Sequence, residues 1–292
     1  MYGCIKLKRL LVPLICIALI ITTFGLVRVA VPNGIKMASV TSSNGGFVPI
    51  IMYHSVSKDN AKLCKFIVSP NELEADMQYL QKNGYTAIFV KDLVSYVYDD
   101  VPLPEKPVIL SFDDGYYNNM MYVLPLLKKY NMKAVISVIG SSTEKFSQIS
   151  DSGKWYSYFT WNDISELSQS GYIEIGNHTY NMHDNGYRRG CCKKWGESDD
   201  AYAKALDDDI LKLQNMLIEK SGVTPVTFTY PYGFVCDESI PLLKKMGFKA
   251  TMTCYERPNY ITKDPDVLFG LDRYNRPSGI STEKFMSKIL DR

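Results

Sequence analysis

The sequence predicts an α/β fold, a distorted (β/α)7-type parallel barrel preceded by an N-terminal transmembrane segment. Short apolar runs alternate with helical patterns, which favours a parallel sheet with right-handed crossovers. About seven such repeats occupy residues 48–292, a length that suits one barrel. Histidines, acids and a tyrosine directly follow the apolar runs, as active-site residues do at the carboxyl ends of barrel strands.

The N-terminus predicts export across a membrane. Residues 1–9 form a basic tail, which places the N-terminus in the cytoplasm and the domain outside the cell. Residues 10–28 contain the uncharged run "LLVPLICIALIITTFGLV", whose 18 residues reach the lower limit for a bilayer span. We expect an uncleaved single-pass anchor; the alternative is a cleaved signal peptide, although no small-x-small exit is clear. Residues 29–47 indicate a linker, and residues 48–292 a single domain.

Charge and cysteine content exclude several classes of protein. The chain has 33 Lys and Arg against 31 Asp and Glu, a formal charge of +2, which gives no electrostatic case for nucleic acid or an acidic partner. The exported part contains Cys64, Cys191, Cys192, Cys236 and Cys254 without C-x-x-C spacing, so neither a zinc ribbon nor a disulfide framework is expected. A bridge between Cys236 and Cys254 and free thiols both remain open.

The strands and helices follow from period and capping signals. The first helix shows this best, because Ser69 is a helix cap, Pro70 occupies the first turn and Glu72 completes a capping box. Strands are expected at 48–54, 86–90, 107–112, 133–140, 172–178, 226–233 and 249–253. Helices are expected at 69–84, 120–130, 160–171, 206–222 and 237–247.

Two motifs carry chemistry. "GNHTYNMHD" holds His178 and His183, two of the three histidines in the chain, and neutral imidazole is the commonest metal ligand. "SFDDG" places Asp113 and Asp114 after a buried strand. One aspartate and two histidines form a three-ligand set with open positions, and the other aspartate is then free to act as a base. The alternatives are an ordinary Asp-Gly turn and a pair of hydrogen-bonded loop histidines.

These segments, together with "TYPYG", resemble the carbohydrate esterase family 4 polysaccharide deacetylases, the NodB-homology fold, over roughly residues 48–275. The resemblance implies that Asp113 is the catalytic base and that Asp114, His178 and His183 bind a divalent metal. Zinc is the expected ion, and Co²⁺, Ni²⁺ or Fe²⁺ are alternatives. The backbone N–H of Tyr232 is implied to help the metal stabilise the oxyanion.

Three departures from that family are informative. The histidines stand five residues apart instead of four, and "VLFGLDRYNRP" (267–277) lacks the usual late histidine. Both features resemble the biofilm poly-N-acetylglucosamine deacetylases, in which an early "YH" supplies the acid, so His54 of "IIMYHSV" is implied as the acid. The alternative for His54 is a buried strand-end histidine with a backbone partner. Thr229 stands where the family has an arginine that orients the base, and Arg273 or Arg276 is the expected substitute.

The expected function is metal-dependent removal of N-acetyl groups from a β-linked amino-sugar polysaccharide by a monomeric enzyme. The metal polarises the amide carbonyl, and a histidine protonates the departing amine. Poly-N-acetylglucosamine is the leading substrate, with peptidoglycan, chitin oligomers and acetylated xylan behind it. A catalytically silent polysaccharide-binding module is the competing class. The insert 185–200 either contacts sugar through Arg188, Arg189 and Trp195 or is a solvated basic loop.

Overall fold

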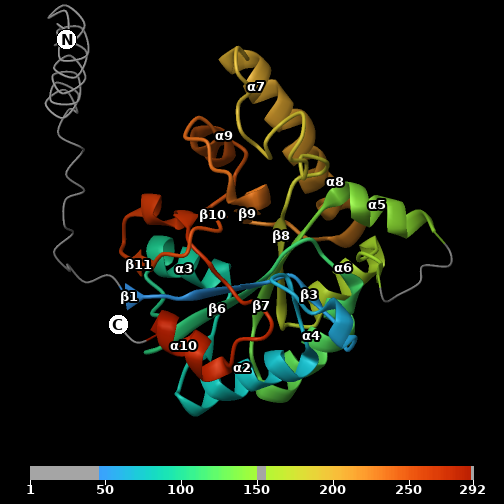
Figure 1. Cartoon of the computed structure of the whole chain (residues 1–292). Helices are drawn as coiled ribbons and strands as arrows, with labels where there is room; N and C mark the ends of the chain where they lie inside the picture. The colour runs from blue at the N-terminus through green and yellow to red at the C-terminus, as the bar shows by residue number, and fades with distance from the viewer. Residues whose placement is uncertain (1–45, 150–155, 291–292) are drawn as a thin grey trace, which may run out of the picture. The chain divides into compact units, whose positions relative to one another are not determined.

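The computed structural model describes residues 46–149 and 156–290. At its centre is a sheet in the order β12-β10-β9-β8-β7-β6-β2-β13, with β5 paired to β6, and every ladder in it is parallel (Figure 1). Its strands are β2 (Ile50–Tyr53), β5 (Thr86–Ala87), β6 (Pro107–Phe112), β7 (Ala134–Val138), β8 (Ile173–Asn177), β9 (Thr227–Thr229), β10 (Ala250–Met252), β12 (Phe269–Leu271) and β13 (Tyr274–Asn275). The parallel α/β class predicted from the sequence is therefore confirmed.

The sheet is a partly open barrel, because its two end strands, β12 and β13, do not pair with each other among the described residues. Only Asp272 and Arg273 separate these strands in the chain. Two neighbouring parallel strands need a crossover connection of a dozen or more residues. A connection of two residues therefore cannot bring β12 and β13 together as a parallel pair. The chain itself spans the opening instead, so the predicted (β/α)7-type barrel is open between β12 and β13.

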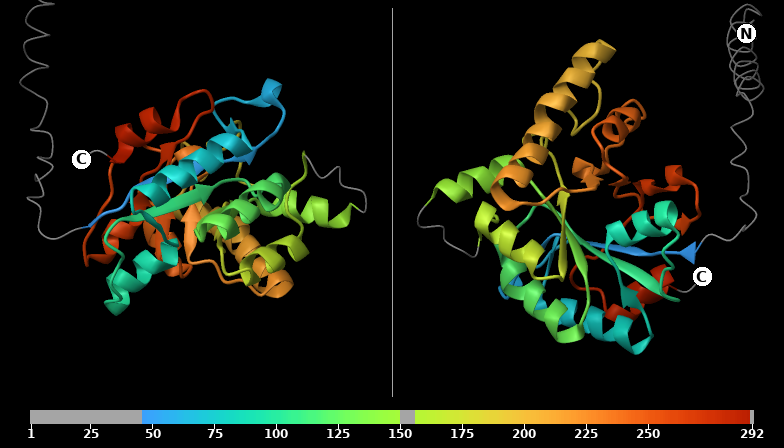
Figure 2. Two further views of the ribbon diagram at one scale, coloured as in Figure 1. Left: turned by 90° about the horizontal axis from the view of Figure 1, so that it is seen from below. Right: turned by 180° about the vertical axis from the view of Figure 1, so that it is seen from behind.

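Helices cover the outside of this sheet (Figures 1 and 2). The outer helices pack in the sequence α10, α2, α4, α6 and α8, each against the next. The α-helices are α2 (Pro70–Lys82), α3 (Val90–Asp99), α4 (Tyr117–Tyr130), α5 (Gly140–Gln148), α6 (Trp161–Gln169), α7 (Asp199–Leu206), α8 (Lys212–Ser221), α9 (Ser239–Lys245) and α10 (Thr282–Leu290). A π-helical stretch, η3 (Asp207–Leu211), joins α7 to α8, and short 3-10 turns are η1 (Asn60–Lys62), η4 (Pro231–Gly233) and η5 (Pro265–Leu268).

Successive side chains along the central strands pack into different clusters of the hydrophobic core. Ile51 and Leu110 belong to the large cluster under the outer helices, whereas Ile50 and Ile109 pack in a second cluster with α3 on the other face. This alternation is the period-2 pattern of a strand that is buried on both faces. A third cluster, around Phe228, joins β9 to α7 and α9. Apolar side chains therefore pack against both faces of the sheet up to the strand ends, where the polar residues begin.

Several predicted elements differ in detail. The expected strand 86–90 is only two residues long, because α3 begins at Val90 with the Asp92 carboxylate accepting from the Phe89 N–H at 2.9 Å. Helices α3, α5 and α10 have no counterpart among the predicted helices, and α7 lies before the predicted helix 206–222 except for Leu206. Gly46 and Phe47, at the end of the expected linker, form β1 (Gly46–Phe47) and pair with β11 (Tyr260–Ile261).

The predicted membrane segment lies outside the described residues. No helix within 46–149 and 156–290 combines the length and the apolar character that a bilayer crossing requires. Cys236 and Cys254 are both free thiols, so the bridge that the sequence left open does not form between them.

Candidate active site

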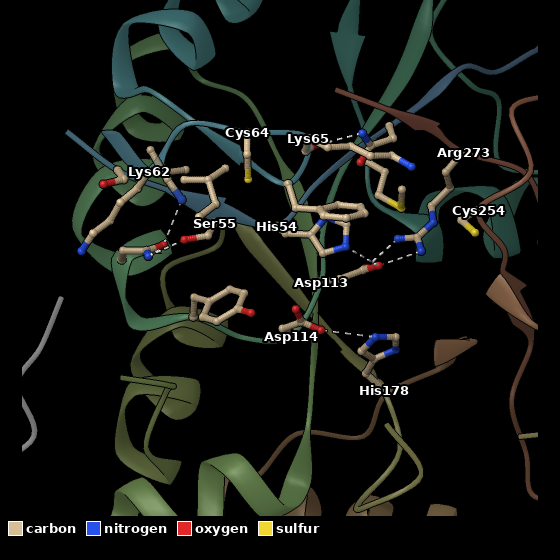
Figure 3. A pocket seen from close by; sticks show the side chains of 18 of the residues that line it. His54, Ser55, Lys62, Cys64, Lys65, Asp113, Asp114, His178, Cys254 and Arg273 are labelled. Atoms are coloured by element: carbon tan, nitrogen blue, oxygen red, sulfur yellow. Dashed lines mark hydrogen bonds and ion pairs between the residues drawn. The ribbon is translucent and has the colours of Figure 1, made fainter. Parts of the chain in front are cut away.

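A pocket of about 950 Å³ opens where the sheet strands end, and the six residues expected to act in catalysis, metal binding or oxyanion stabilisation line it. Figure 3 labels His54, Asp113, Asp114 and His178 among them. His54 follows β2, Asp113 and Asp114 follow β6, and His178 follows β8; His183 and Tyr232 lie on the loops after β8 and β9. The carboxyl ends of parallel strands meet at one edge, which is why residues so distant in sequence converge here.

Asp113 is buried and held by an arginine from the opening between β12 and β13. The Arg273 guanidinium donates to both carboxylate oxygens, with Nη1–Oδ1 at 2.6 Å and Nη2–Oδ2 at 2.8 Å, while its Nε donates to the Thr253 carbonyl. Burial alone would raise the pKa of Asp113, but the Arg273 charge and its two hydrogen bonds hold that pKa well below its usual value. Asp113 is therefore ionised and fixed in orientation.

Asp114, His178 and His183 form a separate cluster of possible metal ligands whose donor atoms all lie within 4.8 Å of one another. The Asp114 Oδ1 atom is 3.6 Å from His178 Nε2 and 3.3 Å from His183 Nε2. This oxygen is buried, and no hydrogen-bond donor among the described residues satisfies it. A buried, unsatisfied carboxylate oxygen facing two imidazole nitrogens is the arrangement that a shared cation would complete.

The tautomer of His178 supports the same interpretation. Its Nδ1 lies 2.8 Å from the Thr229 carbonyl oxygen, which is an acceptor, so Nδ1 carries the hydrogen and Nε2 presents its lone pair to the pocket. Burial lowers the pKa of His178 and favours the neutral form that metals bind. An Asp plus two neutral His is a donor set suited to zinc and to several other first-row ions, so the residues fit a divalent metal.

Local backbone geometry brings the two histidines together despite their spacing of five. Thr179 adopts φ of 70°, and its hydroxyl accepts from the Met182 N–H at 3.2 Å, so the chain turns back immediately after His178. The Asp209 carboxylate holds the same turn by accepting two backbone N–H groups. The ring centroids of His178 and His183 are consequently only 5.0 Å apart.

Positive backbone φ angles concentrate at the pocket. Asp114, at 73°, and Tyr232, at 57°, share this conformation with Thr179. The other two described non-glycine residues with positive φ, Asp100 and Asn131, are the C-caps of α3 and α4. Gly115 follows at φ of 75°, where an added Cβ would lie 2.9 Å from Val138 Cγ1. Glycine is needed at position 115 because a left-handed turn passes directly against β7 there.

His54 faces Asp113 on the side away from Arg273, as Figure 3 shows, with Nε2 3.9 Å from Asp113 Oδ2. Its ring packs edge-on against Phe66 at 4.9 Å, and Asn119 donates to its backbone carbonyl. The Nδ1 atom is buried without a hydrogen-bond partner among the described residues. The alternative of a histidine satisfied by a backbone partner therefore finds no support in the geometry.

Tyr232 lies beside the cluster, its ring centroid 4.6 Å from that of His183. The Tyr232 carbonyl accepts from the Cys254 thiol at 3.0 Å. In Gly233 a Cβ would meet Cys254 Sγ at 2.2 Å, so the turn after β9 tolerates only glycine at that position. These contacts fix the backbone of Tyr232 at the edge of the pocket.

Comparison with known proteins agrees with this geometry. Residues 100–251 match the family model described as polysaccharide deacetylase. The chain belongs to the polysaccharide deacetylase family. It is 29% identical over 242 residues to a putative polysaccharide deacetylase of Bacillus subtilis, covering 83% of this chain and 76% of the relative.

Two further members of the polysaccharide deacetylase family are named for amide-cleaving activity. The poly-beta-1,6-N-acetyl-D-glucosamine N-deacetylase of Escherichia coli is 28% identical over 231 residues; the match covers 72% of this chain but only 34% of the longer relative. The solved de-N-acetylase of Aggregatibacter actinomycetemcomitans superposes with a TM-score of 0.67 at 25% identity, covering 82% of this chain and 99% of the other.

Sequence reasoning about this polysaccharide deacetylase left some site residues undecided or wrong. Of the two arginines considered as partners of the base, Arg273 pairs with Asp113, while Arg276 pairs with Asp76. Arg188, expected as a possible sugar contact, is buried against Glu197 with two hydrogen bonds and faces away from solvent. Trp195, by contrast, is fully exposed. The lysines that line the pocket were missed, because exposed lysines carry no distinctive sequence signal.

Proposed function

We propose that this chain is a divalent-metal-dependent N-deacetylase whose substrate is poly-β-1,6-N-acetylglucosamine. The observation that carries the proposal is the presence, in one pocket, of an oriented carboxylate, a three-donor cluster and a histidine that faces the carboxylate. A polysaccharide-binding module has no need of these groups. The names of the Escherichia coli relative and of its counterparts support the choice of polymer.

Asp114, His178 and His183 would hold the metal, which we expect to be zinc. A divalent ion bound there supplies Lewis acidity toward the acetamide carbonyl and lowers the pKa of water. The chain's own contribution is orientation: the Thr229 carbonyl fixes the His178 ring, and the turn at Thr179 delivers His183. The open mouth of the pocket leaves room for a sugar chain beside these residues.

The remaining residues divide the proton transfers. Asp113, held by Arg273, accepts the proton of the attacking water. His54 donates a proton to the sugar nitrogen as the C–N bond breaks, so the products are acetate and a free amine. The backbone N–H of Tyr232 donates to the oxygen that becomes negatively charged in the transition state. The separation of 3.9 Å between His54 and Asp113 allows both to reach one reacting amide.

The proposal is tested by measuring acetate release from β-1,6-N-acetylglucosamine oligomers. We expect release that a chelator abolishes and that zinc or cobalt restores. Asp113→Asn should lower kcat by about 100- to 10,000-fold, the usual contribution of a positioned base. Asp266→Asn, at an exposed carboxylate paired with Lys244, is the matched control and should leave release unchanged.

Chitin oligomers, peptidoglycan fragments and acetylated xylan form the comparison panel. Release from one of these and none from the β-1,6 polymer would replace the substrate but keep the chemistry. No release from any polymer in the presence of metal, together with saturable binding to one of them, would favour a binding module and contradict the proposal.

A further inference from the structure

One wall of the pocket carries three lysines within eight residues: Lys58, Lys62 and Lys65. We call this group the lysine wall. It lies on the segment between β3 (Ser55–Val56) and β4 (Ile67–Val68), two short strands that pair in parallel. The segment is ordered: Asn275 donates to the Lys65 carbonyl at 2.9 Å, and the Ser278 N–H donates to the Cys64 carbonyl at 3.1 Å.

The charge of the lysine wall is poorly compensated within the described part of the chain. Lys58 and Lys65 form no ion pair there; their ammonium groups lie over the rings of Tyr122 and Phe66, at 5.4 and 5.2 Å from the centroids. Lys62 pairs with Asp59 at 3.7 Å, but both side chains are substantially exposed, and such pairs neutralise little.

Besides Asp59, one further acid lies away from the bottom of the pocket. Glu256 lines the pocket, but it pairs with Lys288 at 2.5 Å. The two aspartates at the bottom are Asp113, which is paired with Arg273, and Asp114, which belongs to the candidate metal cluster. Lys58 and Lys65 therefore keep their charge without a carboxylate partner among the described residues, whereas Lys62 shares Asp59.

The lysine wall flanks the reacting position. In Figure 3, Lys62 and Lys65 lie on the two sides of His54, and His54 faces Asp113. A polysaccharide seated with one acetamido group at Asp113 must continue past His54 in at least one direction. Because Lys58, Lys62 and Lys65 line the same pocket, we expect the sugar next to the reacting one to run along the wall that carries them.

The proposed reaction changes the charge of its own substrate. Each turnover converts a neutral acetamido group into an amine that is protonated near neutral pH. A neighbouring sugar that is still acetylated brings no charge to the lysine wall, whereas a deacetylated neighbour brings a second cation. Like charges at the mouth of a partly desolvated pocket repel more strongly than they do in bulk water.

We propose that the lysine wall selects the charge of the sugar adjacent to the reacting one, accepting acetylated or anionic neighbours and excluding deacetylated ones. The inference rests on the proposed N-deacetylase function and adds a specificity determinant to it. Its consequence is a product with isolated glucosamine units instead of contiguous runs. Summed over three lysines at low salt, the discrimination should be on the order of 5- to 30-fold in kcat/KM.

The test uses two β-1,6-linked pentasaccharides that differ at one position. One is fully acetylated, and the other carries a glucosamine next to the central N-acetylglucosamine; mass spectrometry locates each new amine. The wild-type enzyme should prefer the central unit of the fully acetylated chain. This preference should shrink as sodium chloride is raised toward 1 M, because salt screens exposed charges.

Variants separate charge from shape. The triple change K58Q/K62Q/K65Q should abolish the preference and allow contiguous deacetylation, and K58R/K62R/K65R should retain it. K82Q/K245Q/K284Q removes the same charge from exposed positions outside the pocket and should retain the preference as well.

Equal kcat/KM for both pentasaccharides in the wild type, with acetate released from each, would contradict the proposed role of the lysine wall. The proposed deacetylase function would remain. The same applies if the glutamine variant keeps the full preference. No acetate from either pentasaccharide would overturn the proposed function on this polymer and the inference with it. The salt titration needs no variant, so a folding defect in the glutamine protein does not remove the test.

Discussion

Two buried arginines three residues apart, Arg273 and Arg276, show how one short segment serves both the site and the fold. Arg273 holds Asp113, whereas Arg276 donates to both oxygens of Asp76, at 2.8 and 3.2 Å. Residues separated by three in an extended chain point to opposite sides, so one guanidinium enters the pocket and the other packs under α2. The two arginines therefore have different roles, which substitutions can test separately.

The first prediction compares Arg273→Lys with Arg276→Lys. Each change keeps the positive charge but loses the planar two-pronged contact with a carboxylate. Both should lower the midpoint of thermal unfolding. Only Arg273→Lys should lower kcat per folded molecule, by about 100-fold, because Asp113 is no longer held in its reactive orientation. Steady-state kinetics checks the loss of kcat, with the bound metal quantified in the same samples. Equal losses of kcat in the two variants would show that Arg273 has only a structural role.

The second prediction concerns His54. His54→Ala should lose about 100- to 10,000-fold in amide turnover, the range for a positioned proton donor, while it keeps its bound metal. An activated aryl acetate has a leaving group that needs no proton, so its hydrolysis should fall much less. A folded variant that loses both activities equally, or loses the metal, would remove His54 from the chemistry.

At the scale of elements, Glu72 links the start of α2 to the segment after β13. Its carboxylate accepts from Ser69 N at 2.8 Å, Ser278 Oγ at 2.9 Å and Gly279 N at 2.8 Å. Partial burial would raise the pKa of Glu72, but these hydrogen bonds outweigh burial and lower it. The predicted capping box is thus also a contact between distant parts of the chain.

The third prediction is that Glu72→Ala lowers the free energy of unfolding by about 1–2 kcal/mol at pH 7. Because the folded-state pKa lies below the unfolded one, this contribution is complete above the unfolded pKa and is lost as pH falls through the folded value. The deficit measured by urea unfolding should therefore shrink in acid. Glu74→Ala, at a neighbouring carboxylate paired with Lys129, is the control, and a deficit as large there would contradict the assignment.

The elements show which features a sequence can specify. The capped helix at Ser69 and the buried strand 107–112 were predicted because their signals are local. The run "TAIFV" (86–90) predicts a strand because a short apolar run fits a strand and a helix equally well. The Asp92 carboxylate instead caps a helix there, and α3 begins at Val90. The opening between β12 and β13 depends on which strands pair, which periodicity does not encode.

The candidate site likewise contains residues that the sequence identifies and residues that it leaves undecided. His54, Asp113 and His178 were found because a strand ends directly before each of them, and that position is visible in the sequence. Choosing between Arg273 and Arg276 required the register of β13, with Tyr274 opposite Ile51 and Asn275 opposite Met52. The register is set by packing over long range, so the sequence alone left both residues open.

At the scale of the whole molecule, we propose that residues 10–28 remain attached and anchor an exported domain. The full-length protein should then sediment with membranes, resist carbonate extraction and be cleaved by added protease on intact cells. These outcomes follow from an uncharged run of 18 residues behind a basic tail. Recovery mainly as a shorter soluble form in the medium would show that the segment is a cleaved signal.

The central claim is that Asp114, His178 and His183 form one metal site beside a separate acid–base pair. Calorimetric titration of zinc into the metal-free protein tests it most directly. The account predicts one equivalent bound tightly by the wild type, by Asp113→Asn and by His54→Ala, and loss of that binding in Asp114→Ala, His178→Ala and His183→Ala. Zinc binding that survives in these three variants, or that is absent from the wild type, would contradict it.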